Sequence, residues 1–113
     1  MKKFFLALAA ISLLSLAAST QAQNNYYVDV TNNTGFTVYY LYVSPADAQS
    51  WEEDVLGDDV IMNGETYRVT LSGYNSSIFD IRLVDEDDDT YTFMGVNVAT
   101  QDLNVSLADL DAN

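Results

Sequence analysis

The sequence predicts an all-β fold: a single antiparallel β-sandwich of six to seven short strands, with one short helical turn after Ser44. Apolar and polar residues alternate in short runs rich in valine, isoleucine, tyrosine and phenylalanine, which is the two-residue period of a half-buried strand. Turns rich in glycine, asparagine and serine separate these runs. With 113 residues and no cysteine, the chain has the length of one domain and needs an apolar core, because it has no disulfide.

The first 22 residues have the pattern of a secretory signal peptide. Lys2 and Lys3 precede an apolar run over residues 4–18, and Thr20 and Ala22 form a small-x-small cleavage site. A membrane span needs about 20 apolar residues, so this shorter run is typical of a cleaved signal rather than an anchor. We expect cleavage after Ala22, export to the periplasm or secretion from the cell, and no membrane anchor after cleavage.

Six runs downstream of the signal have strand character. They cover residues 26–31, 36–43, 67–71, 79–83, 90–98 and 103–107. The run at 36–43 is apolar or aromatic on both faces, which suits a central strand or one whose second face is covered. Strand alternation places its neighbours Tyr39 and Tyr40 on opposite faces, so at least one ring is expected at the surface. Such a ring either packs against a neighbouring strand or stacks on a sugar, and both uses stay open.

The run at 90–98 contains an irregularity. Tyr91 and Phe93 are apolar at odd positions, whereas Val96 and Val98 are apolar at even positions. One extra residue near Met94-Gly95 would keep both pairs on the core side, which predicts a β-bulge or a strand break there.

The residues after the second run carry a helix-start signal. Ser44 is a candidate N-cap, Pro45 would be the first helical residue, and Asp47 is an acid in the first turn. The run ends near Ser50, so we expect one or two turns. Trp51 is expected to pack this segment on the sandwich, because a lone large aromatic usually anchors a core.

These elements divide the chain into three parts. They are a cleaved signal peptide over residues 1–22, a β-sandwich domain over 23–107 and a C-terminal tail over 108–113. Ser106 and Asp109 repeat the capping pattern where the tail begins.

Composition excludes several classes of function. The chain has no histidine and no cysteine, which removes nucleophile–imidazole triads, thiol catalysis and Cys/His zinc sites. Its 17 acidic and four basic residues give a net charge of −13, which argues against binding nucleic acid or an anionic membrane surface. Signal cleavage would leave Arg68 and Arg82 as the only cations. Carboxylates alone remain for proton transfer, and their arrangement has no catalytic specificity, so we expect no enzyme.

One acidic run is a candidate calcium site. Five consecutive acids, from Asp85 to Asp89, lie between two strand-like runs and should form a hairpin tip. In an extended stretch Asp85, Asp87 and Asp89 project to one side, and carboxylate oxygens are the ligands that calcium prefers. The loop is not an EF-hand, because Thr90 replaces the glycine at position six and Val96 replaces the glutamate at position twelve. The alternative is a solvated tip whose charge prevents aggregation at the hairpin edge.

A second acidic group follows Trp51 and consists of Glu52, Glu53, Asp54, Asp58 and Asp59. Glu53, Asp54 and Asp58 are weaker candidate metal ligands, which would complete a site with the first group if the two loops meet. The alternative is a solvated loop.

Several short motifs, in their order along the chain, resemble a family of small exported bacterial proteins of unknown function. They are Tyr42-Val43-Ser44-Pro45, Trp51, Asp54-Val55-Leu56-Gly57, Asn63-Gly64, Phe79-Asp80-Ile81-Arg82 and Asp85-Glu86-Asp87. The resemblance covers about residues 28–98. Some members carry the label argininosuccinate lyase, an all-helical tetrameric enzyme far larger than this chain. The resemblance implies an exported location and assigns no functional residue.

Three functions follow from these observations, in order of preference. The first is an exported acidic β-sandwich that acts as a binding or structural module and is stabilised by calcium. The second is an acidic adaptor or subunit that recognises a basic protein partner without metal. The third is a small carboxylate-dependent hydrolase.

Overall fold

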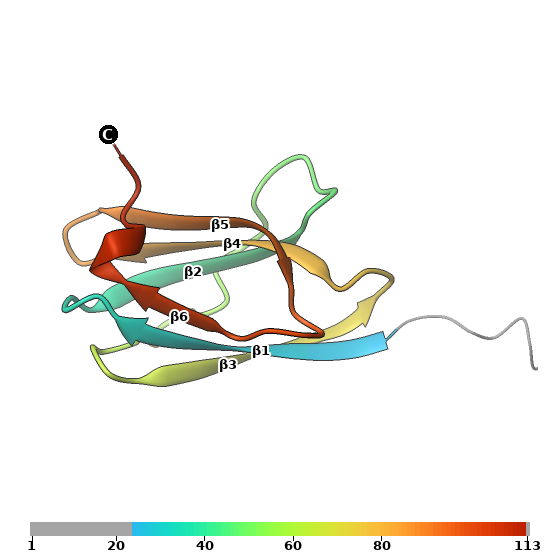
Figure 1. Ribbon diagram of the computed structural model, residues 1–113, viewed down its shortest axis with the longest axis horizontal. Helices are drawn as coiled ribbons and strands as arrows, with labels where there is room; N and C mark the ends of the chain where they lie inside the picture. Colours follow the sequence, from blue (N-terminus) through green and yellow to red (C-terminus); the bar gives the residue numbers. More distant parts are fainter. Residues whose placement is uncertain (1–23, 113) are drawn as a thin grey trace, which may run out of the picture.

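The computed structural model describes residues 24–112, which form six strands and one short helix (Figure 1). The predicted signal peptide over residues 1–22 lies outside the described residues. In chain order the elements are β1 (Asn24–Asn33), β2 (Val38–Pro45), β3 (Thr66–Tyr74), β4 (Ile78–Asp85), β5 (Thr90–Asn97), β6 (Leu103–Ser106) and the 3-10 helix η1 (Leu107–Asp109). The prediction of an all-β fold is confirmed, and each of the six predicted runs corresponds to one strand.

The strands form two three-stranded sheets, in the orders β3-β1-β6 and β2-β4-β5, which lie one above the other (Figure 1). Three pairings are antiparallel, namely β1–β3, β2–β4 and β4–β5. The antiparallel prediction is wrong for β1 and β6, which run parallel with Val30 opposite Leu103. Residues 98–102 carry the chain from one sheet to the other and deliver β6 alongside β1. Strand direction is a long-range property that local alternation does not report.

The core lies between the sheets and is built from the inward side of both. Val28 and Val30 of β1 belong to the same buried cluster as Phe79, Ile81 and Leu83 of β4, and all five have no exposed surface. Each buried side chain of this size contributes about 1.5–3 kcal/mol relative to an exposed one. This apolar contact stabilises the two small sheets without a disulfide.

The predicted bulge in β5 is confirmed. Phe79 lies opposite Val96 and Ile81 lies opposite Phe93, so two residues of β5 face one residue of β4. Gly95 adopts a φ of +67°, which glycine tolerates without steric cost. Its N–H donates a hydrogen bond of 2.8 Å to the Asp80 carboxylate, which holds the bulge in place.

A second bulge, in β2, was not predicted. Val38 pairs with Asp85 and Tyr40 with Val84, so Tyr39 is the extra residue. As a result both tyrosines point outward, with 45% of Tyr39 and 44% of Tyr40 exposed, and their prediction on opposite faces is wrong. The Tyr40 ring stacks on Tyr42 with the centroids 6.4 Å apart.

The predicted helical turn after Ser44 is wrong. Pro45 is the last residue of β2, and its carbonyl accepts the N–H of Ala48 at 2.9 Å to close a turn. The Ser44 hydroxyl does not cap a helix, since it accepts the N–H of Glu52 at 2.8 Å. Strand pairing with β4 overrides the local capping signal. Trp51 does pack on the sandwich as predicted, with its ring 6.5 Å from that of Tyr42.

Two sheet edges are covered by chain that is not itself strand. β2 lies at the edge of its sheet rather than at its centre, and isolated bridges join its Val38 to Ile61 and its Tyr42 to Asp54. At the opposite edge the residues after η1, predicted as a tail, return along β5, where the N–H of Asp111 donates to the Thr90 carbonyl at 2.8 Å. Such coverage protects exposed strand edges from pairing with other chains.

The Asp109 carboxylate accepts the N–H of Ser106 at 2.9 Å at the start of η1, as the capping pattern there predicts. Among the described residues, no helix is long and apolar enough to cross a membrane.

Candidate functional site

The turn between β4 and β5 brings three predicted site residues together. Asp85, Asp87 and Asp89 each place a carboxylate oxygen within 4.8 Å of the other two. Asp85 is buried, Asp87 is exposed and Asp89 is partly buried, so the group reaches from the core to the surface.

Asp85 holds the turn in its conformation. One of its oxygens accepts the N–H of Asp87 at 2.9 Å and that of Asp89 at 3.1 Å. The other oxygen accepts the hydroxyl of Tyr91 at 2.9 Å. The side chain is only 1% exposed, and these three donors replace the water that a buried carboxylate loses. Between them, Asp88 adopts a φ of +65°, which lets the chain reverse direction.

The turn is also fastened to the residue that precedes β2. The N–H of Glu86 donates to the Thr37 carbonyl at 2.9 Å, and the N–H of Thr37 donates to the Glu86 carboxylate at 2.7 Å. This reciprocal pair fixes the turn at the end of the sheet where β2 begins.

The closeness of the acids shifts two ionisation equilibria. Partial loss of hydration, followed by repulsion from Asp85 and the neighbouring carboxylates, raises the pKa of Asp87 above its ordinary value. Burial, together with the hydrogen bond to the Asp85 carboxylate, raises the pKa of Tyr91 to about 12. The proton that Tyr91 donates to Asp85 is therefore held firmly at neutral pH.

The three carboxylates meet part of what a calcium ion requires. Their spacing suits ligands to one cation, and Asp87 and Asp89 reach the surface. Calcium takes six to eight oxygens, however, and both oxygens of Asp85 already accept hydrogen bonds from the protein. The turn is thus stabilised by its own donors.

The second acidic group does not join the first. Within residues 24–112, the acidic side chains that come close enough together to be candidate ligands of one ion are Asp85, Asp87 and Asp89. Asp54 bridges Tyr42 on the outer edge of β2, whereas Asp85 pairs with Val38 on the side of β4. The two groups therefore lie on opposite sides of β2.

Asp54 has a structural task of its own. Its carboxylate accepts the N–H of Leu41 at 2.8 Å and that of Leu56 at 3.0 Å, which ties the loop to the edge of β2. Glu53 and Asp58 are exposed.

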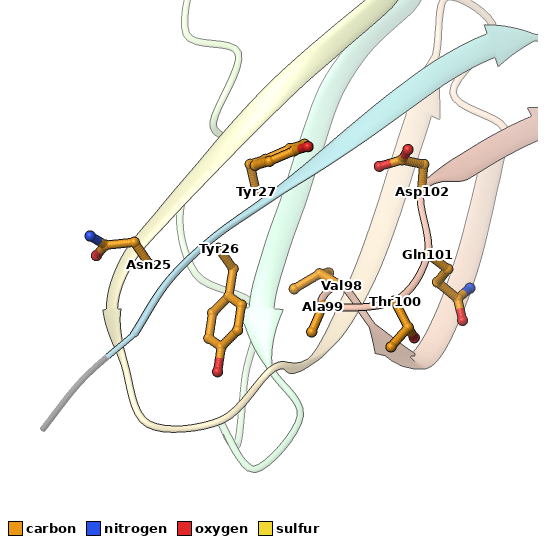
Figure 2. A pocket seen from close by; sticks show the side chains of 8 residues that line it. All are labelled: Asn25, Tyr26, Tyr27, Val98, Ala99, Thr100, Gln101 and Asp102. Atoms are coloured by element: carbon orange, nitrogen blue, oxygen red, sulfur yellow. The ribbon is translucent and has the colours of Figure 1, made fainter. Parts of the chain in front are cut away.

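Sequence reasoning missed a groove at the edge of β1. It has a volume of about 370 Å³ and lies between residues 25–27 of β1 and residues 98–102, the segment that leads to β6 (Figure 2). It exists because β6 has four residues and β1 has ten, so the first half of β1 has no strand on that side. The runs predicted from the sequence, 26–31 and 103–107, are nearly equal in length, so no signal in the sequence pointed to this groove.

A charged cluster borders this groove on the outer face of the sheet. Arg68 of β3 donates two hydrogen bonds, of 2.8 and 2.9 Å, to Asp29 of β1 and lies 4.0 Å from the centre of the Tyr27 ring. The Arg68 guanidinium holds the pKa of Asp29 below its ordinary value. Asp102, at the far side of the groove, accepts the N–H of Asp29 at 3.1 Å.

The other arginine is engaged as well. The Arg82 guanidinium lies 4.9 Å from the centre of the Trp51 ring and donates a hydrogen bond of 3.0 Å to the Thr92 hydroxyl. Both arginines of the described chain thus have partners within it.

The chain was compared with protein-family models, with curated proteins and with solved structures, and none of the three comparisons found a match.

Proposed function

We propose that the protein is an exported, non-catalytic binding module whose acidic surface recognises a basic protein partner. The observation that carries this proposal is the charge of the exposed surface. Ten carboxylate side chains in the described part of the chain are exposed, namely Asp47, Glu52, Glu53, Asp58, Asp59, Glu65, Glu86, Asp87, Asp88 and Asp102. The same part of the chain holds two arginines, and Arg68 is already paired with Asp29, so most of this negative charge is uncompensated.

A surface of one sign favours a partner of the other sign. Complementary charge accelerates encounter and suppresses wrong partners, while like charges at an interface cost several kcal/mol. The uniform negative charge of this surface also opposes association of two copies of this chain through their acidic faces. A basic protein or a basic segment of one is the partner that this charge balance favours.

Because of the geometry of the acidic turn, we rank stabilisation by calcium below recognition of a basic partner. The spacing of Asp85, Asp87 and Asp89 supports a cation site, but hydrogen bonds to Asp85 already stabilise the turn without one. Calcium stabilisation therefore stays a prediction.

A hydrolase ranks third, as the sequence ranks it. A catalytic carboxylate needs burial in a cleft to tune its pKa. Asp85 is the carboxylate that is buried, and its oxygens are engaged by the turn and by Tyr91.

The test is capture of a partner by the immobilised protein from the exported fraction of the producing cells, with elution by salt. Raising NaCl from about 0.1 M to about 1 M shortens the screening length from about 10 Å to about 3 Å, which should release a partner held by charge. The captured protein should be basic.

A neutralised variant and a matched control sharpen this test. Glu52→Gln, Glu53→Gln, Asp58→Asn and Asp59→Asn together should weaken capture, because these side chains are exposed. The exchanges Glu52→Asp, Glu53→Asp, Asp58→Glu and Asp59→Glu keep the charge and should retain the partner. Capture that resists salt, or an acidic partner, would contradict the proposal.

A further inference from the structure

We propose that the free edge of β1, over residues 24–28, accepts an extended segment of a partner chain as an added strand. The basic character of that segment rests on the proposed function, whereas its extended conformation rests on the edge itself. Strand addition to an exposed sheet edge is a common mode of peptide recognition, in which the main chain supplies affinity and alternate side chains supply specificity.

The hydrogen-bonding direction of β1 alternates, and two contacts fix it. The N–H of Asn32 donates to the Glu65 carbonyl, so even-numbered residues of β1 face the β3 side. The N–H of Asp29 donates to Asp102, so odd-numbered residues face the other side. Asn25 and Tyr27 therefore direct their backbone N–H and C=O groups toward the groove.

These backbone groups have no hydrogen-bond partner among residues 24–112. β6 covers β1 only from Val30 onward, and Asp102 caps the N–H of Asp29 just before it. The edges of the other sheet are covered, that of β2 by residues 54–61 and that of β5 by Leu110 and Asp111. The outer edge of β3 is also free, so what distinguishes the bare half of β1 is the groove that lies beside it.

The groove beside this edge has two chemically different walls. Figure 2 shows Tyr26 and Tyr27 leaving β1 in opposite directions, with residues 98–102 running alongside. Tyr26 is partly buried and Val98 is buried, and these two side chains give the inner wall apolar surface. Tyr27 and Asp102 are exposed on the outer side. The volume of about 370 Å³ is in the range of ligand-binding pockets.

An added strand would present its side chains to these walls in turn. Successive side chains of a strand point to opposite faces, so one set would enter beside Tyr26 and Val98 and the other would lie beside Tyr27 and Asp102. The inner set should be apolar. The outer set should be basic, because Asp102 offers a carboxylate for a charge-assisted hydrogen bond, whereas the nearby Arg68 is already paired with Asp29. A second copy of this chain is disfavoured, because it would bring like charge to the edge.

The probe is a nine-residue peptide of alternating valine and lysine, acetylated and amidated at its ends and labelled for fluorescence polarisation. Two further peptides carry N-methyl groups on every lysine or on every valine, which removes N–H donors on one side of the strand and keeps sequence and charge. We expect one methylated peptide to lose about tenfold or more in affinity and the other to retain binding.

The identity of the weakened peptide also reports direction. In an antiparallel pair the residues opposite Asn25 and Tyr27 exchange hydrogen bonds with them, and these share the outer face, so N-methyl-lysine should block binding. In a parallel pair the neighbouring residues bond instead, so N-methyl-valine should block binding. Equal affinity of all three peptides would overturn strand addition.

Proline substitutions test the edge on the protein. Tyr27 lies opposite Thr70 of β3, and the N–H groups of this pair point away from each other toward the two edges of the sheet. Tyr27→Pro removes an N–H from the groove, and the matched control Thr70→Pro removes one from the outer edge of β3. Neither change removes a hydrogen bond between β1 and β3, so both proteins should fold.

With the exported protein purified after expression of the full chain, Tyr27→Pro should weaken binding of the unmethylated peptide about tenfold, and Thr70→Pro should leave it unchanged. The reverse result, or equal effects, would overturn the assignment to β1. If Tyr27→Pro fails to fold, the methylated peptides still decide.

Failure of this inference can be told from failure of the proposed function. Salt-sensitive binding that ignores N-methylation would keep charge recognition and overturn strand addition. Binding that depends on N-methylation but is equally strong for a valine–glutamine peptide at any salt concentration would keep strand addition and overturn the basic partner. A dimer in solution that Tyr27→Pro dissociates would overturn the partner chain as the occupant in favour of a second copy.

Discussion

The hydroxyl of Tyr91 donates a hydrogen bond of 2.9 Å to the Asp85 carboxylate, and both side chains are almost completely buried at the end of the β4–β5 hairpin. A buried carboxylate in an acidic turn is costly unless it is hydrogen-bonded. Here Tyr91 and the turn amides of Asp87 and Asp89 supply those bonds, so the acidic sequence and the tight turn support each other.

Removing the Asp85 acceptors should destabilise the protein. Asp85→Ala leaves two amides and one hydroxyl without their partner, and we expect a loss of about 3 kcal/mol in the free energy of unfolding. Asp85→Asn retains an oxygen for the two amides and should cost about 1 kcal/mol. Urea denaturation measures both. A loss as small for Asp85→Ala as for Asp85→Asn would contradict the structural role of the carboxylate.

Alkaline pH should weaken the fold through Tyr91. Its pKa is raised to about 12 in the folded protein, above the ordinary value of 10.0, so the folded state holds the proton more tightly than the unfolded state. The corresponding stability is fully present below pH 10 and is lost as the pH rises from about 10 to about 12. Tyr91→Phe should remove this part of the pH dependence. Denaturant titrations of both proteins across that pH range measure the free energy of unfolding. An identical dependence of that free energy on pH in the two proteins would contradict the role of Tyr91.

Calcium should raise the melting temperature if the acidic turn binds it. At a calcium concentration 100 times the dissociation constant, the gain would be about 2.7 kcal/mol relative to protein in excess EDTA. Asp87→Asn with Asp89→Asn should abolish the gain, whereas Glu53→Gln with Asp58→Asn should leave it, since those side chains lie elsewhere. Equal shifts from magnesium, or from sodium chloride at matched ionic strength, would indicate charge screening instead.

The bulge in β5 should depend on the backbone freedom of Gly95. Apart from Gly95 itself and its two chain neighbours, no atom lies within 4 Å of the position where a Cβ would stand, so a side chain there meets open space and only the φ of +67° opposes it. Gly95→Ala should therefore destabilise the protein by about 1 kcal/mol, and Gly95→Asn by less, because asparagine tolerates this conformation. Thermal melts of the two variants measure this difference. Equal losses of stability in Gly95→Ala and Gly95→Asn would contradict the view that the backbone conformation causes the loss.

Much of the fold was predictable because strand pattern is local. The position of most strands follows from the alternation of side chains, that of β2 follows from a continuous apolar run, and the bulge near Gly95 follows from a change in the phase of the alternation. The bulge at Tyr39 escaped because that run is apolar on both faces and carries no phase change. The helix signal at Ser44 misled because strand pairing of Pro45 with Phe79 outweighs a one-residue cap.

The candidate site divides in the same way. The grouping of Asp85, Asp87 and Asp89 was predictable, because side chains at alternate positions of a short, extended hairpin tip project to the same side. That Asp54 ties a loop to β2 was not predictable, because it depends on the amides of Leu41 and Leu56 meeting one carboxylate.

By itself, the sequence determined an all-β chain with a strongly acidic composition, because alternation and charge are properties of neighbouring residues and of counts. Only the tertiary structure decided which of those residues contact one another. Pairing between distant segments separated the two acidic groups across β2 and stopped β6 short of the first half of β1. Such contacts join residues far apart along the chain, and the free energy that selects them comes from packing two sheets on one core, which no local pattern contains.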